Sequence, residues 1–368
     1  METPFKMPFY SKTALIFISV LSFGFIMYIG QDIIIPIVYA TIFAILLNPF
    51  VNFLTRKKIN KILAISITLL LTILIVLAII YIFYSRMSMF AESYPQIKLK
   101  LEQTTNQFVK WASHEFNYKP SKINKLISDT QSQAVSHLAN GETLSSLGQL
   151  SITLVLIPVY LFMILYYKSL LLEFIRKLFK QVHHSTVVNV LTNSKNIIQS
   201  YLVGLVFEMI IMAVLNSAGL LLLGIDYAIV LGILAAVLNI IPYIGGIIAT
   251  LLPMIIAFAT KDSLIYPFLV FLITIFIQFI DNNYIVPKIV ASRVQINALI
   301  SVIGVLIGGA LWGVSGMFLS IPLIAILKVI FDHIESLKPW GFLLGNIVPT
   351  NTKFSFIKRK GKLKSLHN

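Results

Sequence analysis

The sequence predicts an all-α polytopic membrane protein with about eight hydrophobic helical segments, two of them interrupted helical hairpins. Of its 368 residues, 58% are hydrophobic and 12% are charged, against about 45–50% and about 25% in soluble domains. Long stretches contain no Asp, Glu, Lys or Arg, and most have the length of a helix that crosses the bilayer. Unbroken apolar runs such as 73–80 exclude the alternating pattern of a membrane barrel.

Six of the uncharged stretches predict full membrane spans. A charged side chain at the bilayer centre costs about 2.5–3.5 kcal/mol on insertion scales, so spans avoid charge. The first stretch is longer than the apolar core of a secretory signal, about 7–15 residues, and it ends without a small-residue cleavage site. We therefore expect it to be retained as an anchor. The six stretches are 13–31, 33–55, 62–85, 143–167, 209–225 and 263–280.

The two longest uncharged stretches, 227–260 and 294–327, predict helical hairpins. Each has 34 residues and would measure about 51 Å as one helix, far more than the hydrocarbon thickness of about 30 Å. Each also carries helix-breaking residues near its middle, and broken backbone at membrane depth is tolerated only where protein or water satisfies it. The breakers are Asn239, Pro242, Gly245 and Gly246 in the first stretch, and Gly304, Gly308, Gly309, Gly313 and Gly316 in the second.

The same order of elements occurs twice. A helix with one embedded acid, first Glu208 and then Asp281, precedes each interrupted hairpin. This order predicts a weak internal duplication that relates 201–260 to 273–330. Such repeats place the substrate site of transporters near the bilayer midplane. We therefore expect a site between the two hairpin tips and the polar residues around Asp281.

Basic residues predict the orientation of the chain. The net charge of +15 gathers near 56–61, 168–195 and 288–293 and in the tail 353–364, which indicates cytoplasmic loops and cytoplasmic termini. A polybasic segment just inside a membrane contacts anionic lipid, so we expect the bilayer and no nucleic acid as a partner. The predicted parts are N-terminal helices 1–85, a long polar extracytoplasmic loop 86–142, a transport core 143–338 and a basic tail 339–368. The loop is expected to be a solvated cap, with a substrate-capturing lid as the alternative.

Acids inside the membrane are the first candidates for a functional site, because retaining them in lipid is costly. Asp281 lies in a polar run with Gln278, Asn282 and Asn283, whose carboxylate and amide oxygens can coordinate a cation or bind a hydroxylated solute. A structural role, in which this cluster satisfies broken hairpin backbone, is the competing interpretation, and the two roles can coexist. Glu208 is either functional, or a protonated acid, or an acid near a helix end that reaches interfacial water.

The helix breakers are candidate hinges or gates. Residues 239–246 combine a helix stop with glycines that permit close backbone approach, and Asn239 adds an amide. This segment is either a hairpin tip that presents backbone dipoles to a solute or a simple turn. The glycines of the second hairpin form two GxxxG spacings, which are typical of tight helix packing. The candidate hinge or gate residues are Pro242, Gly245, Gly246, Pro287, Gly308, Gly309, Gly313 and Gly316.

Three segments of the C-terminal half share their spacing with a known group of membrane proteins. They are N-I-I-P-Y-I-G at 239–245, the run 278–289, and the glycine run 308–316 that closes on Pro322. Over 201–330 the chain resembles the autoinducer-2 exporter family of bacterial inner-membrane proteins. The resemblance implies a homo-oligomeric permease with a moving transport unit, which exports a signalling furanone in some members and exchanges sodium or lithium for protons in others.

The two activities would use the same residues differently. A neutral polar solute would bind to the amides of Asn239, Gln278, Asn282 and Asn283. A cation/proton exchanger would need Asp281, with Glu208 as a second carboxylate. Since the sequence has no Walker A motif, we expect transport driven by an ion gradient or passive transport, moving a small solute or ion by alternating access.

An intramembrane serine protease is the distant alternative. Residues 313–316 read G-V-S-G and match the GxSG pattern of rhomboid proteases. The nearest downstream histidine, His333, follows Ser315 by 18 residues, about 27 Å along a continuous helix. The absence of cysteine removes thiolate nucleophiles and cysteine-based metal sites. We therefore expect no enzyme, no catalytic residues, no cofactor and no metal site.

Overall fold

A computed structural model describes helices over most of the chain. Apart from an isolated bridge between Ile296 and Gly345, the described residues contain no β-structure. Six of their helices are long and apolar enough to cross a membrane, and a bent pair gives a seventh. The all-α polytopic class is thus confirmed. The described residues are 8–81, 99, 103, 109, 113, 155–242 and 244–346, so the tail from 347 on and nearly all of the predicted loop 86–142 lie outside them.

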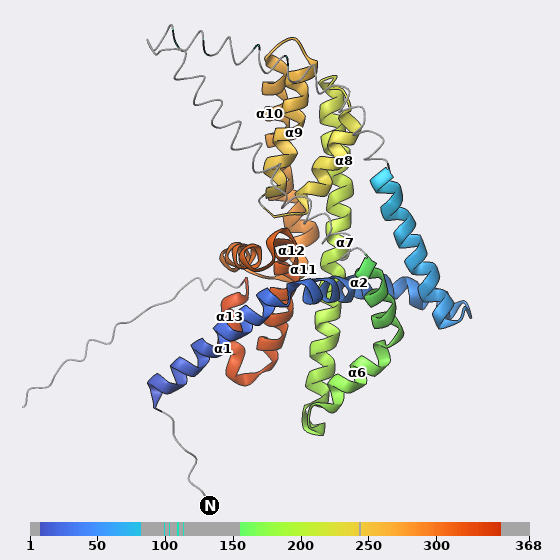
Figure 1. The fold of residues 1–368 in the computed structure, drawn as a ribbon, viewed down its shortest axis with the longest axis vertical. Coiled ribbons are helices and arrows are strands. Elements are labelled where there is room, and N and C mark those ends of the chain that lie inside the picture. Colours follow the sequence, from blue (N-terminus) through green and yellow to red (C-terminus); the bar gives the residue numbers. More distant parts are fainter. Residues whose placement is uncertain are drawn as a thin grey trace, which may run out of the picture.

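The N-terminal half supplies four predicted spans. Helix α1 (Phe9–Ile29) is followed by α2 (Gln31–Arg56) and by a helix over Lys61–Tyr81. The fourth span, Val155–Tyr166, bends by 66° into α6 (Lys168–Lys177). No residue of α1 is buried, and Figure 1 shows this helix leaving the bundle at an angle. The others pack closely through small and aliphatic side chains, as is usual between membrane helices; they include Ala40, Ala44, Ala64, Ile65, Leu161 and Leu165.

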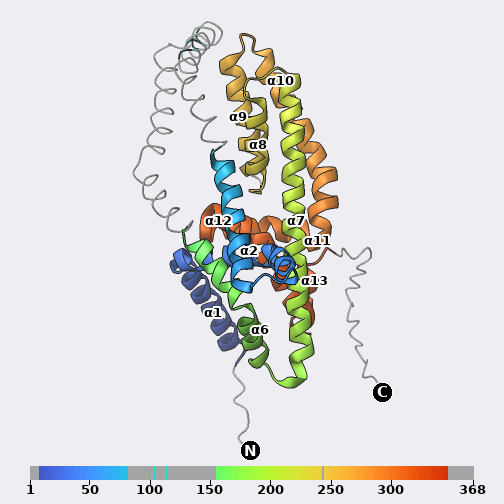
Figure 2. The same cartoon turned by 90° about the vertical axis from the view of Figure 1, so that its right-hand side faces the viewer.

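Helix α7 (His184–Leu222) is the long central helix along which several others pack. It follows a short 3₁₀ turn, η1 (Gln181–His183), and its 39 residues make it about 58 Å long. In Figures 1 and 2, α8, α9 and α10 lie along its upper half, while α2 and α12 cross its middle. The uncharged stretch 209–225 overlaps only the last part of this helix, and Glu208 lies inside the helix, as the sequence predicted. A charge-free window stops at Glu208, but the helix continues through this residue because nothing there breaks it.

The first predicted hairpin is confirmed. Helices α8 (Ala228–Asn239) and α9 (Ile244–Thr260) are two short apolar helices separated by a break at 240–243. The break permits close backbone approach at Gly245, where an added Cβ would lie 1.9 Å from the carbonyl oxygen of Leu238. Only glycine fits this position in the observed backbone.

The second predicted hairpin is confirmed as well. Helix α12 (Ala298–His333) is broken by non-helical backbone at Trp312 and at Gly313, where φ is 58°. Its arms fold against each other, since a Cβ on Gly316 would lie 1.9 Å from the carbonyl oxygen of Gly308. The Ser320 hydroxyl joins the arms further, donating to the carbonyl oxygen of Gly304 at 2.9 Å. The GxxxG spacings thus mark tight helix packing.

The remaining elements connect the two hairpins and close the chain. Helix α10 (Ile265–Ile280) continues into two π-helical segments, η2 (Asp281–Ile285) and η3 (Pro287–Ala291), and then into α11 (Ser292–Val294). After α12 come the 3₁₀ turn η4 (Glu335–Leu337) and α13 (Lys338–Leu344). An acid-bearing helix thus precedes a hairpin twice, as the predicted duplication requires. The duplication itself stays a prediction.

Candidate functional site

A cavity of about 660 Å³ lies within the C-terminal bundle of helices. This volume falls within the range of about 300–1,000 Å³ typical of small-molecule sites. Four parts of the chain form its wall: α7, the tip of the first hairpin, the segment from α10 to α11, and the base of the second hairpin. Its polar lining residues are Tyr201, Glu208, Asn239, Gln278, Asp281, Asn282 and Ser301.

Helix α7 presents one face to the cavity. Tyr201, Leu205 and Glu208 line it, and their spacing of four and three residues places them on the same side of an α-helix. Glu208 stands near the middle of this long helix, and only 7% of its surface is exposed. Its carboxyl group lies close enough to Asp281 for the two acids to interact electrostatically. The alternative that Glu208 lies near a helix end is therefore wrong.

Asp281 is the most deeply buried acid of the site, with 1% of its surface exposed. One carboxylate oxygen, Oδ2, accepts hydrogen bonds from Asn239 Nδ2 at 2.9 Å and from Gln278 Nε2 at 3.4 Å. The other oxygen, Oδ1, is buried and has no hydrogen-bond partner among the described residues. Buried polar atoms are almost always paired, so an orphaned oxygen in a residue that lines a cavity is a candidate for a ligand contact once the site opens.

The π-helical segment η2 sets the direction in which Asp281 points. The N–H of Val286 donates to the carbonyl oxygen of Asp281, five residues back. In a regular α-helix, a spacing of five residues would turn Val286 about 140° away from Asp281. The π-turn absorbs the extra residue, so that both residues line the cavity. Pro287 follows directly; it is exposed and lies outside the cavity wall.

The tip of the first hairpin brings the amide of Asn239 to Asp281. Pro242 and Gly246 line the cavity beside it. At Gly246 an added Cβ would lie 3.4 Å from Gln278 Oε1 and 3.7 Å from Asn239 Oδ1. These are ordinary van der Waals distances, so Gly246 lies directly beside the two amides that surround the carboxylate.

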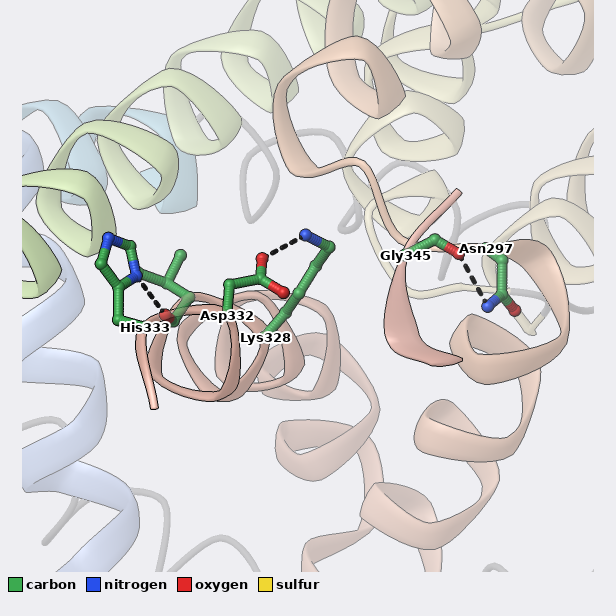
Figure 3. Close-up of polar contacts among 6 residues, drawn as sticks. Asn297, Lys328, Asp332, His333 and Gly345 are labelled. Carbon is green, nitrogen blue, oxygen red and sulfur yellow. Dashed lines mark hydrogen bonds and ion pairs between the residues drawn. The ribbon is translucent and has the colours of Figure 1, made fainter. Parts of the chain in front are cut away.

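The base of the second hairpin closes the cavity through Ile296, Ser301 and Val305. Asn297 fixes this wall in three ways. Its Oδ1 caps α12 by accepting from the N–H of Ile300 at 2.9 Å, and its Nδ2 donates to the carbonyl oxygens of Leu343 at 2.6 Å and Gly345 at 3.1 Å. Figure 3 shows the contact with Gly345. Helix α13 therefore holds the cavity wall in place.

Replacing Asn297 with alanine is expected to loosen this wall. The change removes the cap of α12 and two hydrogen bonds to the end of α13, at a cost of about 2 kcal/mol. Thermal unfolding in detergent should show a midpoint several degrees below that of the unchanged protein. Asn283→Ala is the matched control, because Asn283 is exposed and donates only to the carbonyl oxygen of Phe279. Equal midpoints for both variants would contradict the role of Asn297.

Most predicted site residues come together, but some do not. Glu208, Asn239, Gln278, Asp281 and Asn282 all line the cavity, as do the hinge candidates Pro242 and Gly246. Gly245 lies next to the wall and packs against Leu238. Like Gly245, six other predicted residues do not line the cavity: Asn283, Pro287, Gly308, Gly309, Gly313 and Gly316.

The second hairpin departs from the prediction of a site between two tips. Its tip points away from the cavity, since the Trp312 indole N–H donates to the carbonyl oxygen of Met27 in α1 at 2.9 Å. The lower part of this hairpin, from Ile296 to Val305, lines the cavity instead, and about seven helical residues, or about 10 Å, separate Val305 from Trp312 at the tip. The first hairpin reaches the site with its tip and the second with its base.

Two polar residues of the cavity wall were missed in the sequence. Tyr201 lies seven residues before Glu208, so the helical repeat could have found it. Ser301 carries no such signal, because its position depends on the packing of the second hairpin. Within the described ranges, no three His, Asp or Glu side chains gather as a metal site. Two carboxylates and nearby amides are the oxygen donors that the cavity offers to a hard cation.

The residues of the protease alternative are far apart in the fold. Ser315 lies just after the tip of the second hairpin, where it hydrogen-bonds to Tyr39. His333 ends the same hairpin, and its Nδ1 lies 2.7 Å from the carbonyl oxygen of Val329 (Figure 3). About 27 Å of helix separates the two residues. The structure does not bring this serine and this histidine together.

Comparisons with known proteins relate the chain to transport proteins. The chain is 25% identical over 326 residues to a protein of Haemophilus influenzae provisionally named a transport protein, covering 87% of this chain and 92% of that protein. It is 26% identical over 320 residues to the AI-2 transport protein TqsA of Escherichia coli K12, covering 86% and 91%. A segment of 134 residues is 32% identical to YrrI of Bacillus subtilis, also provisionally named a transport protein, covering 36% and 37%.

A family model covers nearly the whole described bundle. The model of the AI-2E family transporters matches residues 16–336, which include most of α1, all the other spans, both hairpins and every residue that lines the cavity. Together with the apolar helices, this match makes the chain a multi-pass membrane protein of a transporter family. The chain belongs to the AI-2E family of transporters.

Proposed function

We propose that the chain moves a small polar solute across the bacterial inner membrane by alternating access, with the cavity around Asp281 as its binding site. The observation that supports this most is the orphaned carboxylate oxygen Oδ1 of Asp281, a residue that lines a cavity inside an apolar bundle together with six other polar residues. Broken hairpins beside a midplane cavity are the elements that transporters use to open a site alternately to each side. Movement of the first hairpin tip would open or close the cavity next to Asp281.

The chemistry of the wall fits a hydroxylated molecule. Asn239, Gln278 and Asn282 offer amide donors and acceptors, Tyr201 and Ser301 offer hydroxyls, and Asp281 accepts from a hydroxyl. A volume of about 660 Å³ is far larger than a bare ion needs. The relative TqsA is named for AI-2 transport, and a small hydroxylated furanone is a solute of this kind. Export of such a signal is the function that we propose first.

Exchange of sodium or lithium for protons is the second candidate. It is favoured by the pair of acids, because Glu208 and Asp281 line one cavity and interact electrostatically. Two carboxylates of this kind can alternate between a proton and a hard cation. In this case the amides around Asp281 would complete the coordination of the ion.

The orientation and assembly that we propose follow from charge and exposure. Basic residues from two separate clusters, near 56–61 and 168–195, lie together at one end of the spans, which supports a shared cytoplasmic side and cytoplasmic termini.

We also propose a homo-oligomer. Helix α1, which buries no residue within its own chain, offers an apolar surface to lipid or to another copy.

Flux measurements in proteoliposomes test the proposal. Vesicles carrying the purified protein would be given gradients of sodium, of lithium or of the furanone signal, with internal pH and released furanone recorded. Furanone efflux that needs no sodium is expected for export, whereas proton movement driven by sodium or lithium is expected for exchange. Empty vesicles are the control. If neither flux exceeds that of empty vesicles, the proposed function is wrong.

A further inference from the structure

Three lysines from different helices meet at one end of the membrane spans. Lys61 begins the helix Lys61–Tyr81, Lys168 begins α6, and Lys195 lies in the first part of α7. Lys168 is near enough to Lys61 and to Lys195 for their positive charges to repel one another. This group is called the lysine cluster below.

Two of these lysines are held in fixed positions. The ammonium of Lys61 donates to the carbonyl oxygen of Tyr166 at 2.7 Å and lies 5.4 Å from the centre of the Tyr166 ring. The ammonium of Lys168 donates to Oδ1 of Asn48, a buried amide in α2, at 3.0 Å. Because an amide and a carbonyl carry no net charge, these contacts position the lysines without neutralising them.

The lysine cluster has no acidic counterpart among the residues that the structure describes. The ion pairs in that part of the chain join other residues: Arg176 with Glu173, Lys261 with Asp226, Lys328 with Asp332, and Lys338 with Glu335. Three positive charges held together without a negative partner repel one another. An anion bound among them would relieve this repulsion and gain up to three charge-assisted hydrogen bonds.

Neighbouring aromatic residues place the lysine cluster at the level of lipid headgroups. The ring of Tyr166 packs edge-on against Tyr167 at 4.8 Å and stacks on Phe162 at 6.2 Å. Lys57, at the end of α2, lies over the ring of Phe53 at 4.6 Å. Tyrosines and basic residues at the ends of several spans are typical of the boundary between hydrocarbon and water.

The bend after Tyr166 gives this boundary a surface for lipid chains. Here the span Val155–Tyr166 turns by 66° into α6, and α6 lies beside the lower half of α7 (Figures 1 and 2). Val159 and Met163 are exposed on the span, and Leu170 and Phe174 are exposed on α6. An apolar surface that leads directly to fixed positive charges suits a molecule with acyl chains and an anionic head.

We propose that the lysine cluster binds the phosphate headgroup of an anionic phospholipid at the bend between the fourth span and α6. The phosphate oxygens accept hydrogen bonds from Lys61, Lys168 and Lys195, while the acyl chains lie against Val159 and Met163. Nothing in this proposal depends on the transported substrate, because the lysine cluster shares no residue with the cavity wall.

Lipid retention measured by native mass spectrometry tests the proposal. The full chain, purified in detergent, would be offered phosphatidylglycerol, phosphatidylcholine or inorganic phosphate, and the bound fraction would be recorded for each. We expect retention of phosphatidylglycerol, which falls at least about tenfold in Lys61→Gln/Lys168→Gln, since each lysine near the headgroups contributes about fivefold in affinity. Lys177→Gln/Lys180→Gln is the matched control, because it removes the same charge from exposed positions outside the lysine cluster.

A second pair of variants and the other two ligands decide between the possible outcomes. Lys61→Arg/Lys168→Arg keeps the charges and should retain the lipid, which separates loss of binding from loss of folding. Equal retention by the glutamine pair and its control would overturn the proposal, as would equal binding of phosphatidylglycerol and phosphatidylcholine. Binding of inorganic phosphate as strong as that of phosphatidylglycerol would assign the lysine cluster to free phosphate and overturn the lipid assignment.

Discussion

Asp281→Asn is expected to lower transport at least about tenfold, whichever cargo the cavity carries. Asparagine keeps the size of the side chain but removes the negative charge. Hydrogen bonds to charged groups contribute about 1.5–3 kcal/mol, and about 1.4 kcal/mol corresponds to a factor of ten. A cation/proton exchanger would lose most of its coupled flux, because one of its two titratable ligands would be gone and only Glu208 would remain. Flux of sodium, lithium, protons and furanone in proteoliposomes measures the effect.

Asp226→Asn provides the matched control for this experiment. Asp226 carries the same side chain, but it is exposed between α7 and α8, and its carboxylate lies 3.9 Å from the ammonium of Lys261. It does not line the cavity, so its substitution should leave flux within about twofold of the unchanged protein. Size-exclusion profiles establish that both variants are folded. Full activity of Asp281→Asn would remove Asp281 from the proposed site.

The fold could be predicted from the sequence wherever local chemistry decides it. Helix breakers in two stretches too long for one span predicted both hairpins, and the structure breaks them at 240–243 and at Trp312 and Gly313. Embedded acids predicted where polar groups gather, since Glu208 and Asp281 face the same cavity. Charged residues, glycine and proline determine the conformation of the segment in which they lie. Their effect can therefore be predicted from the sequence without knowledge of tertiary contacts.

The parts that could not be predicted depend on contacts between distant segments. The π-turn at Asp281 is set by how α10 packs, and no residue pattern at 281–286 requires it. The second hairpin turns its tip toward α1 because Trp312 finds a carbonyl at Met27, far away in the sequence. For the same reason Ser301 at the hairpin base was missed, and Asn283, in the middle of a polar run, was placed in the site although it faces outward.

Gly245→Ala is expected to distort the first hairpin and, through it, the binding site. The added methyl group would lie 1.9 Å from the carbonyl oxygen of Leu238 and 2.8 Å from Cα of Asn239, and backbone atoms cannot rotate away as a flexible side chain would. Such overpacking costs about 1–3 kcal/mol or more, which opposes the gain of about 0.5–1 kcal/mol that alanine normally brings to a helix. A lower thermal unfolding midpoint is the first expected result.

The second expected result of Gly245→Ala is a loss of transport. The clash pushes the hairpin arms apart at the point where Asn239 donates a hydrogen bond to Asp281. Gly24→Ala in α1 is the matched control, since an added Cβ there meets no atom within 4 Å; it should leave flux unchanged and should not lower the unfolding midpoint. Flux lost at an unchanged midpoint would indicate that the hairpin tip relaxes but misplaces Asn239. A variant as stable and active as the unchanged protein would instead show that the tip is not closely packed, and the gating role proposed for it would fall.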